Sequence, residues 1–238
     1  MILSNKKRIQ DFTDKGWWGN DTLYSLFQDA LGQCADQEGL VDPENRLIIT
    51  GDSPKRLTYQ EIHETVERYA AIFYEQGLRK DDIAIIQLPN VVELPMVYLA
   101  LSKLGIICSP VPMQYGAYEI TSIISDVDPK AFISIQTFNG KSHAKKFSSI
   151  FVNGELNFSL GSLDGFIDLH QCNPSEKSMS EQELYANENT SSANDIFTIC
   201  WTSGTTGTPK GVPRSHNLWL PMANAAAFVS ETEEGDTL

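Results

Sequence analysis

The sequence is poor in positive charge, which excludes one large class of partners. Its 18 lysine and arginine residues stand against 31 aspartate and glutamate residues, for a formal net charge of −13. A protein that holds a nucleic-acid backbone needs a basic face. The two basic clusters, Lys6–Arg8 and Lys141–Lys146, are interpreted as solvated surface. We therefore expect no nucleic-acid partner. A small anion can still bind, because charges spread over the surface are screened beyond about 8 Å at physiological salt.

Long apolar segments are missing as well. The longest apolar stretch, around Leu94–Leu101, is too short to cross a bilayer. The N-terminus, Met1–Arg8, lacks the apolar region of a signal peptide. We therefore expect no transmembrane segment and a cytoplasmic location.

Cysteine is scarce and not clustered. The four cysteines, at positions 34, 108, 172 and 200, form no Cys-x-x-Cys pair. This predicts free thiols in a reducing compartment. His170 and Cys172 resemble half of a metal site, but no second half is visible, so no metal ligand is predicted.

The apolar residues that are present, 41% of the chain, follow an alternating pattern of strands and helices. Near-continuous apolar runs at 83–86, 106–108, 131–135 and 196–201 are typical of strands buried on both faces, as in parallel sheets. Segments with helical patterns, 91–104 and 118–127, lie between them. We predict an α/β fold with a largely parallel sheet flanked by helices.

Several smaller elements are also predicted. A helix is expected over 23–34, and another begins at the capping box Thr58–Glu61, buries Ile62, Val66, Tyr69, Ala70 and Phe73, and stops near Gly77. Short strands are expected at 46–50 and 150–152, and a polar helix at 142–149. Residues 171–194 are polar with little apolar periodicity and are predicted to be a surface linker.

The segment Thr202–Gly211 carries the chemistry. It follows an apolar strand and precedes a segment, 215–230, that can be helical. Its glycines let the backbone approach a ligand closely, its hydroxyl and amide groups can hydrogen-bond phosphate oxygens, and Lys210 adds a positive charge. It is neither a Walker A loop, because Pro209 breaks the required spacing, nor a Gly-x-Gly-x-x-Gly fingerprint. The alternative is a flexible Gly/Thr linker, which rarely follows a buried strand.

This segment, continued by Val212–Asn217, resembles the signature of the AMP-forming acyl-CoA synthetases, luciferases and peptide-synthetase adenylation domains. The resemblance extends over the whole chain through Lys15–Trp18, Leu57–Glu61, Gly77–Asp82, Gln87–Asn90 and Leu104–Gly105. It implies that a carboxylate attacks the α-phosphate of Mg²⁺·ATP to give an acyl-adenylate and pyrophosphate, and that coenzyme A then accepts the acyl group. Lys210 would be the catalytic residue. The ATP-binding residues implied are Thr202, Ser203, Gly204, Thr205, Thr206, Gly207, Thr208 and Lys210.

Three further side chains have two interpretations each. His216 is expected to cap a backbone group in neutral form rather than to catalyse. Arg214 is either a phosphate contact or a surface residue. Trp17 and Trp18 are expected to anchor the N-terminal arm on the core.

The resemblance also implies motifs that this sequence lacks. An acyl-pocket segment, an adenine- and Mg²⁺-binding segment, a ribose-binding aspartate, a hinge and a C-terminal lysine are not found. Residues 1–238 are therefore predicted to be a partial N-terminal adenylate-forming domain without its C-terminal domain. Such a chain is expected to be inactive alone, and to be marginally stable, to self-associate or to depend on the rest of its protein.

The intact enzyme is expected to be a ligase that activates a cyclic, aromatic or medium-chain acid. Gly16–Trp18, Thr22–Leu23 and Gln87–Asn90 resemble that branch. Two alternatives remain open: an aryl-AMP ligase that loads a carrier protein, and a non-catalytic, nucleotide-binding remnant.

Overall fold

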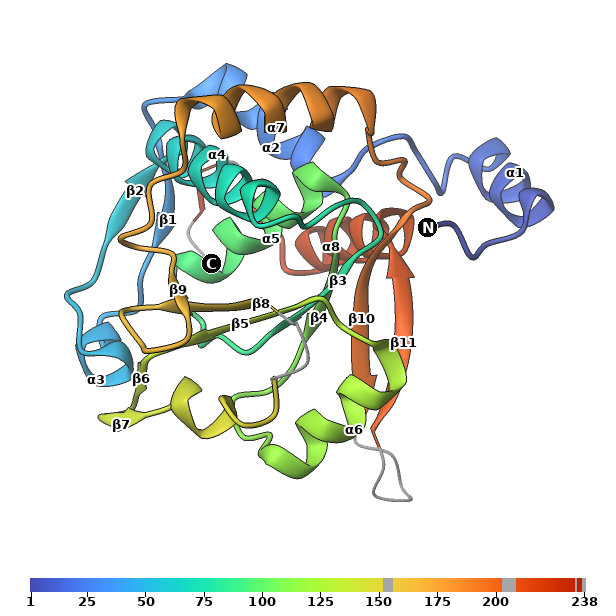
Figure 1. Ribbon diagram of the computed structural model, residues 1–238. Coiled ribbons are helices and arrows are strands. Elements are labelled where there is room, and N and C mark those ends of the chain that lie inside the picture. Colours follow the sequence, from blue (N-terminus) through green and yellow to red (C-terminus); the bar gives the residue numbers. More distant parts are fainter. Residues whose placement is uncertain (152–155, 203–208, 234, 237–238) are drawn as a thin grey trace.

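A seven-stranded sheet forms the centre of the molecule (Figure 1). The computed structural model describes residues 1–151, 156–202, 209–233 and 235–236. The strand order is β11-β10-β4-β3-β5-β8-β9, and every neighbouring pair is parallel except β10 and β11. The strands are β3 (Ile83–Ile86), β4 (Ile107–Pro110), β5 (Ala131–Ile135), β8 (Leu156–Leu160), β9 (Ile167–Asp168), β10 (Ile196–Thr202) and β11 (Lys210–Ser215). The predicted α/β fold with a largely parallel sheet is confirmed.

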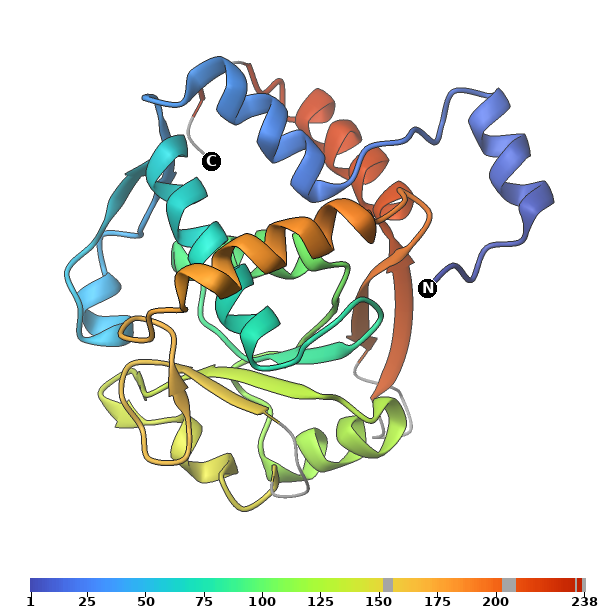
Figure 2. The ribbon, with the colours of Figure 1, turned by 45° about the horizontal axis from the view of Figure 1, so that its top comes forward.

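Helices cover both faces of this sheet (Figures 1 and 2). On one face lie α2 (Leu23–Cys34), α4 (Tyr59–Glu75), α5 (Glu93–Leu104), α7 (Glu176–Glu188) and α8 (His216–Val229). The other face carries α6 (Ala117–Val127) and the 3₁₀ helix η1 (Ala144–Phe147). The main core lies under α4 and α5, and a smaller core, which includes Ile85 and Phe132, lies under α6. No helix in the described ranges is both long and apolar enough to cross a bilayer.

Helix α4 shows how local sequence and packing agree. The Thr58 hydroxyl accepts a hydrogen bond from the Glu61 N–H, and the Glu61 carboxylate accepts one from the Thr58 N–H, so the predicted capping box is present. The apolar face predicted for this helix is buried in the main core. Gly77 follows the helix with φ of +89°, a conformation that costs glycine little.

The segment 171–194 is not a linker throughout, because most of it forms α7. The Ser175 hydroxyl caps this helix by accepting a hydrogen bond from the Ser178 N–H. Tyr185 packs against Tyr74 of α4 with ring centroids 5.4 Å apart, and its hydroxyl accepts a hydrogen bond from the Lys80 N–H at 2.8 Å. The helix is held largely by polar contacts, so its sequence shows little apolar periodicity.

Other local predictions were wrong. The apolar run at 46–50 is a short helix, α3 (Arg46–Thr50), in which Leu47 and Ile48 are exposed. Residues 142–149 hold the end of a short strand at Ser142 and the 3₁₀ helix η1 instead of the predicted helix, and Ile150 and Phe151 belong to no strand. The remaining elements are α1 (Lys6–Asp14) and the strand pairs β1 (Glu38–Val41) with β2 (Arg56–Thr58) and β6 (Thr137–Phe138) with β7 (Lys141–Ser142).

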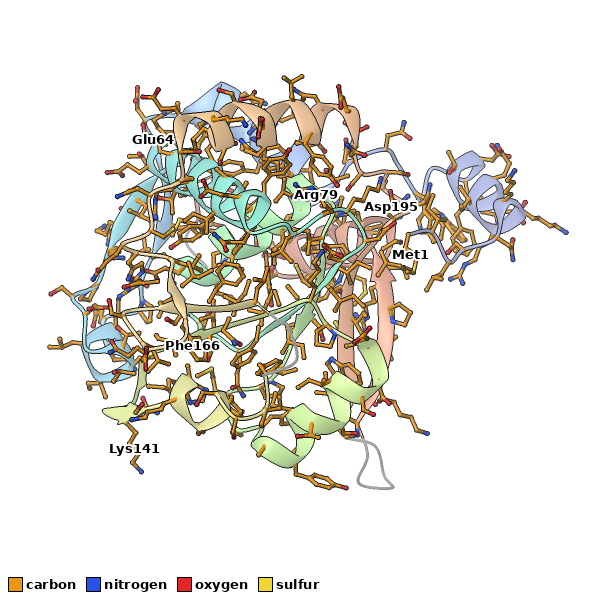
Figure 3. The ribbon with its side chains drawn as sticks, in the orientation of Figure 1. Met1, Glu64, Arg79, Lys141, Phe166 and Asp195 are labelled. Carbon is orange, nitrogen blue, oxygen red and sulfur yellow. The ribbon has the colours of Figure 1, made fainter. Side chains whose placement is uncertain are left out.

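Helix α1 lies apart from the other helices, and both tryptophans predicted to anchor the N-terminal arm on the core contact Phe12 of this same helix. Helix α1 projects away from the other helices, while Met1 lies next to Asp195 at the start of β10 (Figure 3). The Trp18 ring is buried edge-on against Phe12, with ring centroids 4.9 Å apart. Trp17 is 58% exposed and contacts the same Phe12, so it does not anchor the arm on the core.

Candidate functional site

Strands β10 and β11 form an antiparallel hairpin that brings the two described ends of the predicted ATP-binding loop together. Thr202 is paired directly with Lys210, and the Thr202 hydroxyl donates a hydrogen bond to the Lys210 carbonyl at 3.4 Å. Both side chains are exposed. The other predicted site residues, Ser203 to Thr208, lie outside the described residues. Sequence reasoning placed Lys210 in a loop, whereas it is the first residue of β11.

The hairpin places Lys210 at a chemically useful edge of the sheet. Strand β10 runs parallel to β4, β3 and β5, so Thr202 lies at the edge where those strands also end. Open α/β sheets bind their ligands outside the carboxyl ends of the strands. Thr202 and Lys210 therefore lie at the edge where a phosphate ligand would be expected.

The exit of β3 at this edge is fixed by a buried pair that sequence reasoning missed. The Gln87 side-chain amide donates hydrogen bonds to the carbonyls of Pro112 at 2.9 Å and Tyr115 at 3.1 Å. The Gln87 Oε1 atom is then left as an acceptor, 3.0 Å from His143 Nε2, so the His143 Nε2 carries the proton. Burial, and less strongly Lys146, lower the pKa of His143 to about 4, so its imidazole is neutral at pH 7.

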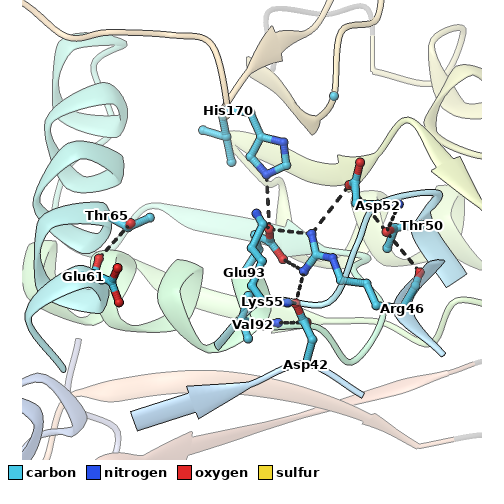
Figure 4. A network of polar contacts seen from close by, with 12 residues as sticks. Asp42, Arg46, Thr50, Asp52, Lys55, Glu61, Thr65, Val92, Glu93 and His170 are labelled. Carbon is cyan, nitrogen blue, oxygen red and sulfur yellow. Dashed lines mark hydrogen bonds and ion pairs between the residues drawn. The ribbon is translucent and has the colours of Figure 1, made fainter. Parts of the chain in front are cut away.

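A buried ionic cluster fixes the start of α5, just beyond Gln87–Asn90 (Figure 4). The Arg46 guanidinium donates two hydrogen bonds to Glu93, both at 2.8 Å, and one to Asp42 at 2.7 Å. Lys55 Nζ lies 2.6 Å and His170 Nε2 3.4 Å from Glu93 Oε1. Burial opposes ionisation of Glu93, but the hydrogen bonds from His170, Arg46 and Lys55 outweigh it and hold its pKa well below the usual range.

Asp42 ties this cluster to the backbone, because its carboxylate accepts a hydrogen bond from the Val92 N–H at 3.0 Å. Val92 precedes the first residue of α5. A buried ion pair is weak support for stability in itself. Its clear effect here is to fix where the helix that follows the β3 exit begins.

His216 caps a backbone group, as predicted. Its Nδ1 atom accepts a hydrogen bond from the Leu23 N–H at 3.2 Å, at the first residue of α2, and its ring stacks on Phe197 at 4.8 Å. Burial lowers the pKa of His216 to about 4 despite the opposing charge of Asp195, so the ring is neutral at pH 7 and can accept this bond. Arg214 is half-buried with its guanidinium 5.4 Å from the Trp219 ring centroid. Its guanidinium also lies 3.9 Å from the Met222 sulfur, and a phosphate contact of Arg214 stays a prediction.

The described ranges contain no group of three or more histidine, cysteine, aspartate or glutamate side chains arranged to hold a metal ion.

The family of the chain is shown by comparison with known proteins. Residues 30–238 match the model of the AMP-binding enzyme family, so the chain belongs to that family of adenylate-forming ligases, which use ATP and bind carboxylic acids. Among curated relatives, pseudomonine synthase PmsE of Pseudomonas entomophila (strain L48) is 28% identical over an alignment of 225 positions, which covers 93% of this chain and 34% of that protein. Acetyl-coenzyme A synthetase 1 of Saccharomyces cerevisiae is 28% identical over an alignment of 231 positions, which covers 90% of this chain and 32% of that protein.

The fold is shared with solved structures of larger proteins. The apo structure of MbtA from Mycobacterium smegmatis superposes on 99% of this chain and 41% of its own, with a TM-score of 0.76 at 19% sequence identity. The chain thus spans between about a third and two fifths of the length of these proteins.

Proposed function

We propose that this chain supplies the ATP-phosphate site of an acyl-CoA synthetase. In the first step a carboxylate oxygen of the acid attacks the α-phosphorus of ATP, and the bond to the bridging oxygen breaks to release pyrophosphate. In the second step the thiol of coenzyme A attacks the acyl carbon, loses its proton and releases AMP. Mg²⁺ is proposed to enter this reaction bound to ATP.

One observation carries the proposal: Thr202 and Lys210 are paired at the carboxyl edge of the sheet, where they close a loop rich in glycine and threonine. Negative charge builds on the β- and γ-phosphates as pyrophosphate leaves, and fixed donors with one cation stabilise that charge. A lysine about 4 Å from a phosphate is worth roughly 4 kcal/mol at an effective dielectric near 20. Such a local contact outweighs the chain's diffuse net charge.

The acid is proposed to be cyclic, aromatic or medium-chain, and the acceptor to be coenzyme A. The choice of acid rests on the resemblance of Gly16–Trp18, Thr22–Leu23 and Gln87–Asn90 to that branch. The choice of acceptor is supported by the similarity to an acetyl-coenzyme A synthetase. A cytoplasmic location belongs to the same proposal and is supported by four free cysteines.

The test is ATP–pyrophosphate exchange by the full-length protein against a panel of carboxylic acids, followed by mass analysis of the product with coenzyme A. We expect exchange with a cyclic, aromatic or medium-chain acid and formation of its coenzyme A ester. Exchange with an aryl acid but transfer only to a carrier protein would replace this proposal with an aryl-AMP ligase. Exchange with amino acids alone would favour a peptide-synthetase domain, and no exchange with any acid would favour a non-catalytic remnant.

A further inference from the structure

The end of the β10–β11 hairpin that carries Thr202 and Lys210 has limited support from the rest of the sheet. The two strands pair with one another from Ile196 and Ser215 to Thr202 and Lys210. Strand β10 is paired in register with β4 at Thr198, which lies opposite Cys108. Thr198 lies four residues before Thr202. Contacts other than this strand pairing must therefore hold the far end of the hairpin in position.

A hydrogen bond from Trp201 supplies such a contact. The indole Nε1–H of Trp201 donates to the Ser109 hydroxyl at 2.8 Å, and Ser109 is fully buried on β4. The Trp201 ring also packs against the core under α6. This bond joins the residue immediately before Thr202 to the interior of the sheet.

The glycine opposite Trp201 is needed for this arrangement. Gly211 pairs with Trp201 across the hairpin. A Cβ atom on Gly211 would lie 2.9 Å from the Ile199 side chain and 3.1 Å from the Trp201 ring. A side chain at position 211 would crowd both Ile199 and the Trp201 ring, so the space that Gly211 leaves, directly beside Lys210, is shared by these two side chains.

We propose that Trp201 is a positioning residue for Lys210, acting through its hydrogen bond to Ser109 and its ring contact with Gly211. This inference rests on the proposed function, in which Lys210 contacts a phosphate oxygen. Trp201 itself is not required to touch the ligand. A small displacement of a group that binds the reacting phosphates has a large effect, because such contacts depend on geometry.

The chain contains a matched control for the hydrogen bond between Trp201 and Ser109. The indole Nε1–H of Trp219 on α8 donates to the Thr198 hydroxyl at 2.6 Å. This is the same chemistry on the same hairpin, but it acts at the base, where β10 is already paired with β4. Trp201→Phe and Trp219→Phe each remove one indole N–H and keep an aromatic ring.

The experiment measures the dissociation constant for inorganic pyrophosphate by calorimetry, together with hydrogen exchange of the non-proline amides of β11, in the full-length protein. Lys210→Ala is expected to weaken pyrophosphate binding by about ten- to a hundredfold. Trp201→Phe is expected to weaken it by about two- to tenfold and to speed hydrogen exchange in β11, whereas Trp219→Phe should change the affinity less than about twofold. Ser109→Ala should reproduce the effect of Trp201→Phe, and the double variant should be no weaker than either single variant.

Two results separate this inference from the function on which it rests. If Lys210→Ala weakens binding and both Trp201→Phe and Ser109→Ala leave affinity and hydrogen exchange unchanged, Trp201 does not position Lys210, although the proposed function stands. If Lys210→Ala leaves pyrophosphate affinity unchanged, the proposed function fails and the positioning role fails with it. Thermal unfolding of each variant distinguishes a local change from loss of the fold, and Ser109→Ala provides the test if Trp201→Phe does not fold.

Discussion

Two buried histidines make the folded chain sensitive to mild acid. His143 and His216 have pKa values of about 4 in the folded chain, against about 6.5 for an exposed histidine. As the pH falls below 6.5, the unfolded chain takes up protons at both positions while the folded chain does not. The stabilising free energy is therefore fully present above pH 6.5 and is lost progressively until about pH 4.

The magnitude follows from these pKa values. Between pH 7 and pH 5, each histidine lowers the free energy of unfolding by about 2 kcal/mol, so the pair lowers it by about 4 kcal/mol. Carboxylates with lowered pKa values, such as Glu67 and Asp195, lose their contribution mainly below pH 4.5, where an ordinary carboxylate begins to protonate. The range from pH 7 to pH 5 thus isolates the histidines.

The assay is urea unfolding followed by circular dichroism at pH 7 and at pH 5. His216→Asn keeps an acceptor for the Leu23 N–H but cannot be protonated, so the loss of stability between the two pH values should shrink by about 2 kcal/mol. His143→Gln should shrink it by a similar amount. The reasoning is refuted if both buried-site variants keep the wild-type pH dependence, or if either imidazole titrates near pH 6.5 by NMR.

Three other outcomes are expected. Titration of the unfolded, unreduced protein with a thiol reagent should find all four cysteines free, and a count of two or none would contradict a reducing compartment. Glu93→Gln removes one partner of the buried Arg46 and should lower the free energy of unfolding by about 3–5 kcal/mol in urea; a loss below 1 kcal/mol would mean that the cluster is not coupled to folding. The 238-residue chain alone should show no ATP–pyrophosphate exchange, and in sedimentation it should self-associate, because α8 presents apolar side chains such as Phe228 and Val229, which are 86% and 80% exposed. A monomer that turns over like the full-length protein would contradict this expectation.

Much of the sheet was predictable because buried parallel strands leave a strong local signal. The runs at 83–86 and 131–135 are apolar throughout, since both faces of each strand meet helices or the core, and both are strands. Helix α4 was predictable for a similar reason, because its cap and its apolar face lie within one continuous segment. Confirmed predictions are therefore those in which local propensity and tertiary burial agree.

The features that were missed depend on pairing and side-chain contacts that leave no periodic signal in the sequence. Strand β11 contains glycine and proline, which disfavour strands, and it forms because it pairs along β10. The bond between Gln87 and His143 joins residues 56 apart, and the contact between Glu93 and Arg46 joins residues 47 apart. No periodicity in the sequence reveals such pairs. The ends of the predicted ATP-binding loop could be found from a motif, but the side-chain contacts around them could be found only from the structure.

The central claim is that Lys210 binds the phosphates of ATP during formation of an acyl-adenylate. It is tested most directly by comparing the full-length protein with its Lys210→Ala variant in two reactions: ATP–pyrophosphate exchange, and thioester formation from a supplied acyl-adenylate. Loss of one charge-assisted contact costs about 1.5–3 kcal/mol, so exchange should slow by about ten- to a hundredfold while thioester formation slows much less. An unchanged exchange rate would contradict the account and would mean that the lysine points into solvent throughout the reaction.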